Sequence, residues 1–280
     1  MTKKAIHILT ISCADEKGLI CKISSLLAEH NLNIVRNGEY VDESTETFFI
    51  RCELEGELDG ATIVAALNTS LPAGSHIELK PRAKKDIVIM ATKEYHCLGD
   101  LLLKYHFGDL FAEVTAVISN HEHLRALVES FDIPFYWVPA DGLKREEHEE
   151  KVLNLLDQFD PDLIVLAKYM RILTPKFVDT YKNKIINIHH SFLPAFIGAN
   201  PYRQAYNRGV KIIGATAHFV TDDLDEGPII HQSVIPVDHQ FSAKGMARSG
   251  RDVERSVLGH ALDLVLKDRV MINGNKTIIF

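Results

Sequence analysis

The sequence lacks the signatures of the common nucleotide-binding and thiol-based sites. It contains no G-x-G-x-x-G and no G-x-x-x-x-G-K-[ST], so neither the dinucleotide fingerprint nor the P-loop is present. Its four cysteines lie within the first 97 residues without a C-x-x-C pair, which argues against a thiolate metal site and a disulfide framework. No G-x-S-x-G elbow is present either. Any chemistry must therefore depend on other residue types.

Long apolar runs and an excess of basic charge are also missing. No stretch approaches the roughly 18 apolar residues of a membrane span, and residues 1–7 have too short an apolar core for a signal peptide. The net charge is −7, from 38 acidic and 31 basic residues, which disfavours nucleic acid as the main partner. We therefore expect a globular, cytoplasmic protein that binds neither membranes nor nucleic acid.

The first part of the chain has the pattern of a small α/β domain. Strands are expected at residues 6–11, 31–35, 46–52 and 76–79, and helices at 19–27 and near 60–70. This order is the βαββαβ arrangement of ferredoxin-like folds. The segment offers no group of residues suited to catalysis.

A basic segment at residues 80–85 separates this pattern from the rest of the chain. It contains Pro81 and has no hydrophobic periodicity, as is typical of a solvated linker. We place the first domain at residues 1–82, the linker at 83–85 and the second domain at 86–280.

The second domain alternates strands with stretches long enough for helices. Continuous apolar strands are expected at residues 87–91, 114–118, 135–138, 163–166 and 185–188. They predict an α/β domain with a mainly parallel sheet, whose sites lie beyond the carboxyl ends of the strands. Further strands at 212–220 and 229–234, a long helix at 243–266 and a hairpin turning at Asn273-Gly274 complete the chain.

Polar side chains end the strand at residues 185–188. Asn187 and His189 are two residues apart and project to the same face, whereas His190 is expected to face the other way. An amide and an imidazole on one face can donate hydrogen bonds to an oxyanion, and the imidazole can also move a proton. The alternative is that both are ordinary hydrogen-bonded groups at a strand end.

An acidic loop supplies a possible partner for His189. A carboxylate beside an imidazole fixes its tautomer and orientation. The loop contains Asp222, Asp223, Asp225 and Glu226, and the residues alone do not decide which of them faces the histidine or whether all are solvated. The fourteen histidines form no ligand set by their spacing, so we expect no metal site.

The first domain resembles the ACT family. The similarity rests on DEKGLI at residues 15–20 and LAEHNLNI at residues 27–34. It implies a small amino acid as regulatory effector, with methionine and glycine as candidates, and a homo-oligomer paired through these domains. Its effector-binding positions correspond to Asp15, Gly18 and Asn33, which serve equally well as turn and capping residues.

The second domain resembles the formyltransferase family that uses 10-formyltetrahydrofolate. Three ordered segments carry the similarity: LAKYMRIL at 166–173, NIHHSFLP at 187–194 and GATAHFVTDDLDEGP at 214–228. The resemblance implies a Rossmann-like domain with Asn187, His189 and Asp225 as catalytic residues, and His218 and His190 as supporting neighbours. The implied folate-binding residues are Met170, Arg171, Ile172, Leu173, Thr221 and Asp222.

The combination of the two domains is similar to the formyltetrahydrofolate deformylases, which implies hydrolysis to tetrahydrofolate and formate without a cofactor. Related transferases hold a phosphorylated amine acceptor with a Gly/Ser/Asn-rich loop after the first strand. Residues 92–99 here are TKEYHCLG, which favours water as the acceptor, and His190 stands where transferases usually have proline. Two alternatives remain: a formyltransferase with an amine acceptor, and a non-catalytic sensor of amino acids or folate.

Overall fold

The structure is a computed structural model that describes residues 5–195 and 201–280. Residues 1–4, part of the segment compared with a signal peptide, lie outside the described residues. The chain folds into two compact units. The first unit comprises residues up to Ala83 together with 267–271 and 278–280, and the second comprises 84–266 and 272–277. Among the described residues, no helix is both long and apolar enough to cross a membrane.

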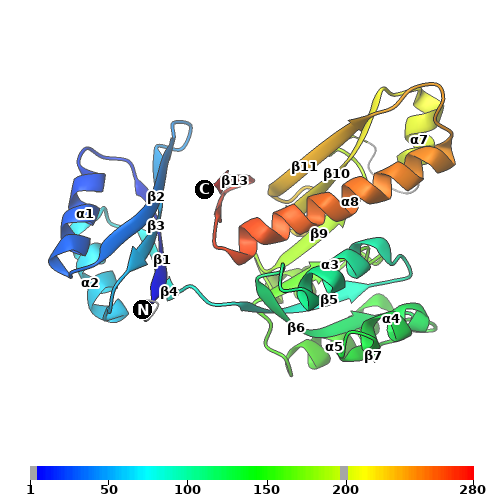
Figure 1. The fold of residues 1–280 in the computed structure, drawn as a ribbon, viewed down its shortest axis with the longest axis horizontal. Coiled ribbons are helices and arrows are strands. Elements are labelled where there is room, and N and C mark those ends of the chain that lie inside the picture. Colours follow the sequence, from blue (N-terminus) through cyan, green and yellow to red (C-terminus); the bar gives the residue numbers. More distant parts are fainter. Residues whose placement is uncertain (1–4, 196–200) are drawn as a thin grey trace. The chain divides into compact units, whose positions relative to one another are not determined.

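The first unit has the predicted ferredoxin-like fold. Its elements are β1 (Ile6–Ala14), α1 (Leu19–Glu29), β2 (Asn33–Asp42), β3 (Thr47–Glu55), α2 (Gly60–Ser70) and β4 (His76–Pro81). The strands form an antiparallel sheet in the order β2-β3-β1-β4, and both helices cover the same face (Figure 1). Apolar residues at helical spacing on α1, such as Leu19, Ile23 and Leu27, pack against this face.

The basic segment at residues 80–85 has a strand at each of its ends. Strand β4 continues to Pro81, and the next strand already begins at Lys85. Because β4 is an edge strand, the missing N–H of Pro81 removes no ladder hydrogen bond. Only residues 82–84 lie outside the strands, and the backbone N–H of Arg82 still donates to the carbonyl of Ile6 at 2.9 Å.

The second unit has the predicted alternation of strands and helices. Its first half contains β5 (Lys85–Ala91), α3 (His96–His106), β6 (Ala112–Ser119), the 3₁₀ turn η1 (Glu122–Leu124), α4 (Arg125–Glu129), β7 (Phe135–Trp137) and α5 (Arg145–Leu156). Its second half contains β8 (Leu163–Leu166), α6 (Pro175–Thr180), β9 (Ile185–His189), α7 (Pro201–Arg208), β10 (Ile212–Phe219), β11 (Ile229–Pro236) and α8 (Ala243–Leu266).

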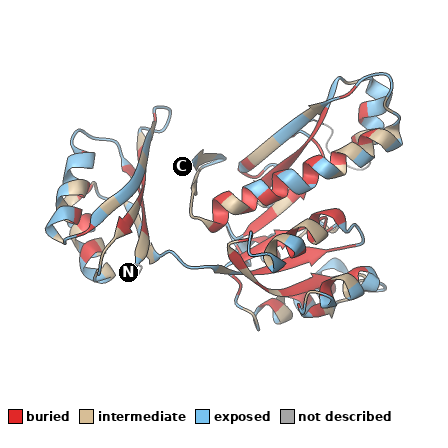
Figure 2. Cartoon of the chain, viewed as in Figure 1, coloured by how far each residue is buried: buried red, intermediate tan, exposed pale blue. Residues whose placement is uncertain are grey.

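These strands form a seven-stranded sheet in the order β11-β10-β9-β8-β5-β6-β7. Strands β9, β8, β5, β6 and β7 run parallel to one another, whereas β10 is antiparallel to both β9 and β11. The prediction of a mainly parallel sheet is thus confirmed. The chain proceeds outward from β5 on one side through β6 and returns on the other through β8, so the sheet has a switch point between β5 and β8. The central strands are buried along their length (Figure 2).

Helix α8 packs its apolar face on β9, β10 and β11. Val253, Val257, Leu258 and Ala261 recur at helical spacing and are buried, and buried and exposed positions alternate around the helix (Figure 2). Glu254 lies within this apolar face and is only 1% exposed. A carboxylate there requires bound partners.

The end of the chain forms the predicted hairpin, from β12 (Val270–Asn273) and β13 (Lys276–Ile279). The two turn residues are Gly274 and Asn275 instead of the predicted Asn273-Gly274, with Gly274 at a φ of +58°. Arg51 on β3 fixes the start of this segment within the first unit. Its guanidinium donates to the carbonyls of Lys267 and Asp268 at 2.9 and 2.6 Å.

Candidate active site

The second unit contains a cavity of about 640 Å³ beside the carboxyl ends of β8 and β9. The sequence-predicted residues that line it are Met170, Arg171, Ile172, Leu173, Asn187, His189, His190, His218, Thr221, Asp222 and Asp225. The fold therefore brings together residues that are up to 55 positions apart in the sequence (170 to 225). Further side chains, which sequence reasoning missed, come from α7, α8 and the loop after β5.

The pairing of β9 with β10 places His218 directly opposite Asn187. Opposite residues of an antiparallel pair share a face, and Nδ2 of Asn187 lies 3.2 Å from Nε2 of His218. Nδ1 of His218 donates to the carbonyl of Phe219 at 2.8 Å, and its Nε2 faces both the amide of Asn187 and, at 3.6 Å, Oδ1 of Asp225. These contacts fix the side chain of Asn187 where it lines the cavity.

His189 is held by Asp225. Its Nδ1 lies 3.2 Å from Oδ2 of Asp225, and both side chains are almost completely buried. Nε2 of His189 is buried and has no hydrogen-bond partner among the described residues. Burial acts to raise the pKa of Asp225, but hydrogen bonds from His189 and His218 outweigh it and hold that pKa well below its ordinary value. Asp225 therefore remains a charged partner that fixes the imidazole with one nitrogen facing the cavity.

The path of the 221–228 loop selects Asp225 from the four acidic candidates. A Cβ on Gly227 would overlap the carbonyl oxygen of Phe219, so only glycine lets the loop fold back this tightly on β10. Asp225 itself adopts a left-handed conformation with φ +59°. Asp222 lines the cavity, whereas Asp223 and Glu226 are exposed and do not.

His190 does not point away from His189, as strand alternation predicted. Strand β9 ends at His189, so the two-residue alternation does not extend to the next position. The two imidazole centroids lie 5.1 Å apart, and both side chains line the cavity. Burial, followed by the charge of Lys168, lowers the pKa of His190 to about 4.

The segment after β8 forms an apolar part of the cavity wall. Met170 and Ile172 are 58% and 50% exposed, although both are large apolar side chains. The backbone N–H of Met170 donates to the hydroxyl of Thr92 at 3.0 Å, which ties this segment to the loop after β5. These exposed apolar side chains suit a ligand that has a flat, apolar surface.

Helix α5 corrects one expectation. Its sequence is acidic and predicts a solvated His148, but His148 and Glu149 are 1% and 4% exposed. Nε2 of His148 donates to the carbonyl of Val138 at 2.9 Å, and the carboxylate of Glu149 accepts from both the backbone N–H and the hydroxyl of Thr174. Each polar group thus has a fixed partner, which permits its burial. Glu149 thereby anchors the end of the 170–174 segment.

A second buried group lies beside the catalytic candidates and centres on Glu254. Its Oε2 accepts from Nε2 of His96 at 2.8 Å and from Nζ of Lys168 at 3.1 Å, and its Oε1 accepts from the hydroxyl of Tyr202 at 2.6 Å. Burial acts to raise the pKa of Glu254, but His96, Lys168 and Tyr202 lower it to about 2. The charged residue on the apolar face of α8 is the sequence signal that would have revealed this cluster.

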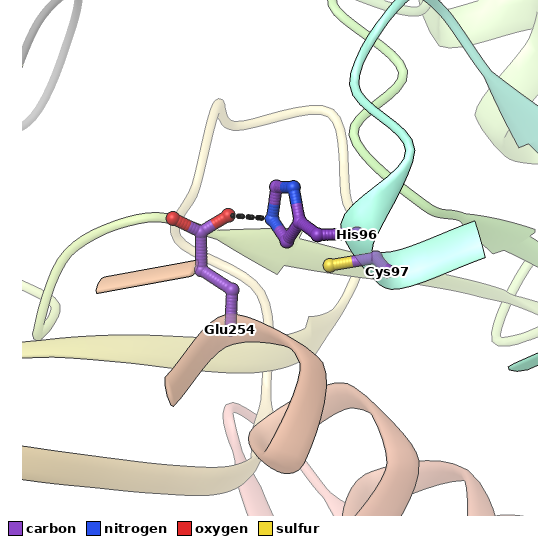
Figure 3. A group of neighbouring side chains, drawn as sticks. All are labelled: His96, Cys97 and Glu254. Atoms are coloured by element: carbon purple, nitrogen blue, oxygen red, sulfur yellow. Dashed lines mark hydrogen bonds and ion pairs between the residues drawn. The ribbon is translucent and has the colours of Figure 1, made fainter. Parts of the chain in front are cut away.

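Donor atoms of His96, Cys97 and Glu254 lie within 4.8 Å of one another, with the first two at the start of α3 and the third on α8 (Figure 3). Two observations disfavour a metal ion there. The ammonium of Lys168 already contacts the carboxylate, and burial raises the pKa of the Cys97 thiol, which opposes the thiolate that a metal requires. The donor set fits an ion-pair network better.

The candidate effector residues lie in the first unit but not at one place. Gly18 precedes α1 with φ +91°, and Asp15 follows β1 near Thr47, which pairs with Ala14. Asn33 pairs with Glu55, at the opposite end of β3. One copy of the sheet therefore does not bring Asn33 together with Asp15.

Comparison with known proteins identifies the family of each part of the chain. The Formyl transferase model matches residues 85–262, and the ACT domain model matches residues 7–70. A formyltetrahydrofolate deformylase from Escherichia coli is 58% identical over 272 residues, which are 97% of each chain.

Solved structures give the same result. A formyltetrahydrofolate deformylase from Pseudomonas syringae pv. tomato has a TM-score of 0.95 at 41% identity, and the match covers 100% of this chain and 96% of that one. A glycinamide ribonucleotide transformylase from Symbiobacterium toebii has a TM-score of 0.68 at 28% identity, and covers 75% of this chain and 100% of its own. Only the first similarity includes the N-terminal unit in full, and this chain belongs to the formyltetrahydrofolate deformylase family.

Proposed function

We propose that the chain hydrolyses 10-formyltetrahydrofolate to tetrahydrofolate and formate, with water as the acceptor of the formyl group. The observation that carries the proposal is the buried imidazole of His189. Asp225 holds its Nδ1 at 3.2 Å, and Nε2 is left without a partner among the described residues, in a cavity that Asn187 also lines. Such an arrangement suits reactions in which an oxyanion forms at a carbonyl carbon.

The folate would bind across the cavity with its ring system on the apolar segment after β8. Met170 and Ile172 supply exposed apolar surface on one side, and Leu224, 50% exposed, supplies it from the loop after β10. Backbone groups of both segments and the side chains of Thr221 and Asp222 are available to the polar edge of the ring. This places the formyl group between Asn187 and His189.

The reaction then requires only side chains and water. Asp225 orients the water and takes its proton while the oxygen bonds to the formyl carbon, and N–H groups of Asn187 and His189 stabilise the oxyanion. The C–N10 bond breaks as His189 gives N10 a proton, and the proton on Asp225 returns to His189. Formic acid leaves and ionises to formate. No metal or nicotinamide takes part.

Release of formate without any amine is the expected result that separates the three candidate functions. Mixed with 10-formyltetrahydrofolate alone, the protein is expected to form formate and tetrahydrofolate in equal amounts over many turnovers, because water is the acceptor. Formate is measured enzymatically and tetrahydrofolate by its absorbance. A transferase would release tetrahydrofolate only after an amine is added, with an N-formyl amine instead of formate as the second product, and a sensor would bind the folate without turnover; either result would reject hydrolysis.

The ACT domain supports a regulatory proposal, in which a small amino acid binds between the first units of two copies. Asp15 and Asn33 lie at opposite ends of β3, so a site that uses both positions needs a second copy of the chain. Strand β2 is an edge of the sheet, the position at which a strand from a second copy could be added. This supports a homo-oligomer with the effector at its interface.

Methionine or glycine is expected to change the turnover rate of the full chain in a saturable manner. In Asn33→Ala, the amino-acid concentration that gives half of the effect should rise by about tenfold. This is the change in affinity expected when a polar ligand loses one or two hydrogen bonds. Asn68→Ala, on the exposed face of α2, is the matched control and should respond like the wild type. Regulation by this site is rejected when neither amino acid alters the rate, or when Asn33→Ala responds unchanged.

A further inference from the structure

The Glu254 cluster is a built feature of the cavity that the proposed reaction does not use. Glu254 and Lys168 are 1% and 4% exposed, and both line the cavity together with Tyr202. The two oxygens of Glu254 together accept from three donors, so the carboxylate has little capacity left to bind a ligand. Its role is therefore to hold the side chains around it.

The side chain it holds most directly is Tyr202. A Cβ on Gly250 would overlap the ring of Tyr202, so glycine at this position of α8 lets the ring lie directly on the helix backbone. The phenol then reaches Glu254, one turn further along α8. Tyr202 is thus fixed at both its ring and its hydroxyl, although it lies on a different helix, α7.

The cluster adjoins the catalytic candidates through His190. The ring of His190 lies 5.1 Å from that of His189 on one side and 6.2 Å from that of Tyr202 on the other. The apolar segment after β8 and the loop after β10 supply the surface for folate. Tyr202, Lys168 and Glu254 line the same cavity as His189.

We propose that Tyr202, anchored by Glu254, Lys168 and His96, is a wall that admits water to the formyl carbon and excludes amines. This inference rests on the proposed function, since it explains which acceptor that reaction uses. Without the side chain of Tyr202, a second reaction could take place at the formyl carbon. An amine nitrogen forms the new C–N bond, the bond to N10 breaks, and the proton lost by the amine goes to N10, which gives an N-formyl amine and tetrahydrofolate.

The test measures two products from one mixture of 10-formyltetrahydrofolate and glycinamide at about pH 8, where an α-amino group is partly unprotonated. N-formylglycinamide is quantified by mass spectrometry and formate enzymatically. For the wild type, the N-formyl product should not exceed the enzyme-free background. In Tyr202→Ala, the ratio of N-formylglycinamide to formate should rise about tenfold or more, the range expected when one buried group stops excluding a competitor.

Two variants separate the ring of Tyr202 from its hydroxyl and from general effects. Tyr202→Phe keeps the ring on Gly250 and should retain the wild-type product ratio. Tyr206→Ala removes an exposed tyrosine, 47% accessible, from the next turn of α7 and should also leave the ratio unchanged. Should Tyr202→Ala fail to fold, Tyr202→Leu carries the same expectation with a smaller loss of packing.

Two results would contradict the proposed role of Tyr202. One is a wild type that forms N-formylglycinamide above background, and the other is a folded Tyr202→Ala or Tyr202→Leu that releases formate but forms no N-formyl product. Failure of the proposed function gives a different result, namely a wild type that releases no formate when no amine is present.

Discussion

Asp225→Asn is expected to reduce turnover by roughly 10³- to 10⁴-fold. The substitution keeps the shape of the side chain but removes the charge that faces Nδ1 of His189 at 3.2 Å. In a Ser-His-Asp triad, the same change costs about 10⁴-fold, because the imidazole is no longer held in the productive tautomer. Formate release from 10-formyltetrahydrofolate under saturating conditions measures the effect.

The pH dependence of this variant provides an internal check. An ordinary aspartate has a pKa of about 3.9, and the pKa of Asp225 lies well below that, so Asp225 is ionised throughout the neutral range. The activity deficit should therefore be equally large at every pH between about 5 and 8. The exposed Asp223 on the same loop gives the matched control, Asp223→Asn, which should retain wild-type turnover. A deficit of less than about tenfold would remove Asp225 from the catalytic group.

The same pKa shift has a consequence for stability. Because the pKa of Asp225 is lower in the folded chain than in the unfolded chain, ionised Asp225 stabilises the fold above the unfolded-state pKa. That contribution is lost as the pH falls through the folded-state pKa. The stability difference between wild type and Asp225→Asn should accordingly be greatest near neutral pH and diminish in acid.

Asn187→Ala is expected to reduce turnover by roughly 10²- to 10³-fold, the usual cost of one oxyanion donor of about 2.7–4 kcal/mol. The loss should appear in kcat, with little change in KM, because the hydrogen bond strengthens only as the oxyanion forms. His218 holds this amide at 3.2 Å, so the donor is oriented before the substrate binds.

A structural explanation for the same loss is excluded by two measurements. Asn187→Ala should bind a non-hydrolysable folate as tightly as the wild type, and Asn154→Ala, at an exposed position on α5, should leave kcat unchanged. Turnover within about threefold of the wild type in Asn187→Ala would assign the asparagine a purely structural role.

The sequence predicted the part of the site that depends on local pattern. Strand alternation identified Asn187 and His189 as neighbours on one face, because both lie within β9. The same rule was wrong for His190, which follows the last residue of that strand. Local pattern also left four carboxylates as partners for His189, since the choice depends on the tight return of the loop at Gly227. The family resemblance, not residue spacing, singled out Asp225.

Long-range contacts account for what pattern analysis missed. His96, Lys168, Tyr202 and Glu254 come from four separate elements or loops and meet only in the folded chain. In α5, the acidic sequence concealed two buried residues, His148 and Glu149, whose partners lie outside the helix. Hydrophobic periodicity shows which side of a helix is mainly buried. It does not show that a single polar residue is buried because it has a hydrogen-bond partner elsewhere in the chain.

The contacts of Arg51 affect the order in which the two units can finish folding during synthesis. Residues 5–83 leave the ribosome long before residues 267–271 and 278–280, yet these late segments belong to the same compact unit. Until they arrive, the buried guanidinium of Arg51 lacks the carbonyls of Lys267 and Asp268. The unit that is synthesised first is therefore finished last. A premature stop near the C-terminus, or proteolytic trimming there, would remove contacts of the N-terminal sheet. The residues that line the cavity around His189 would still be present.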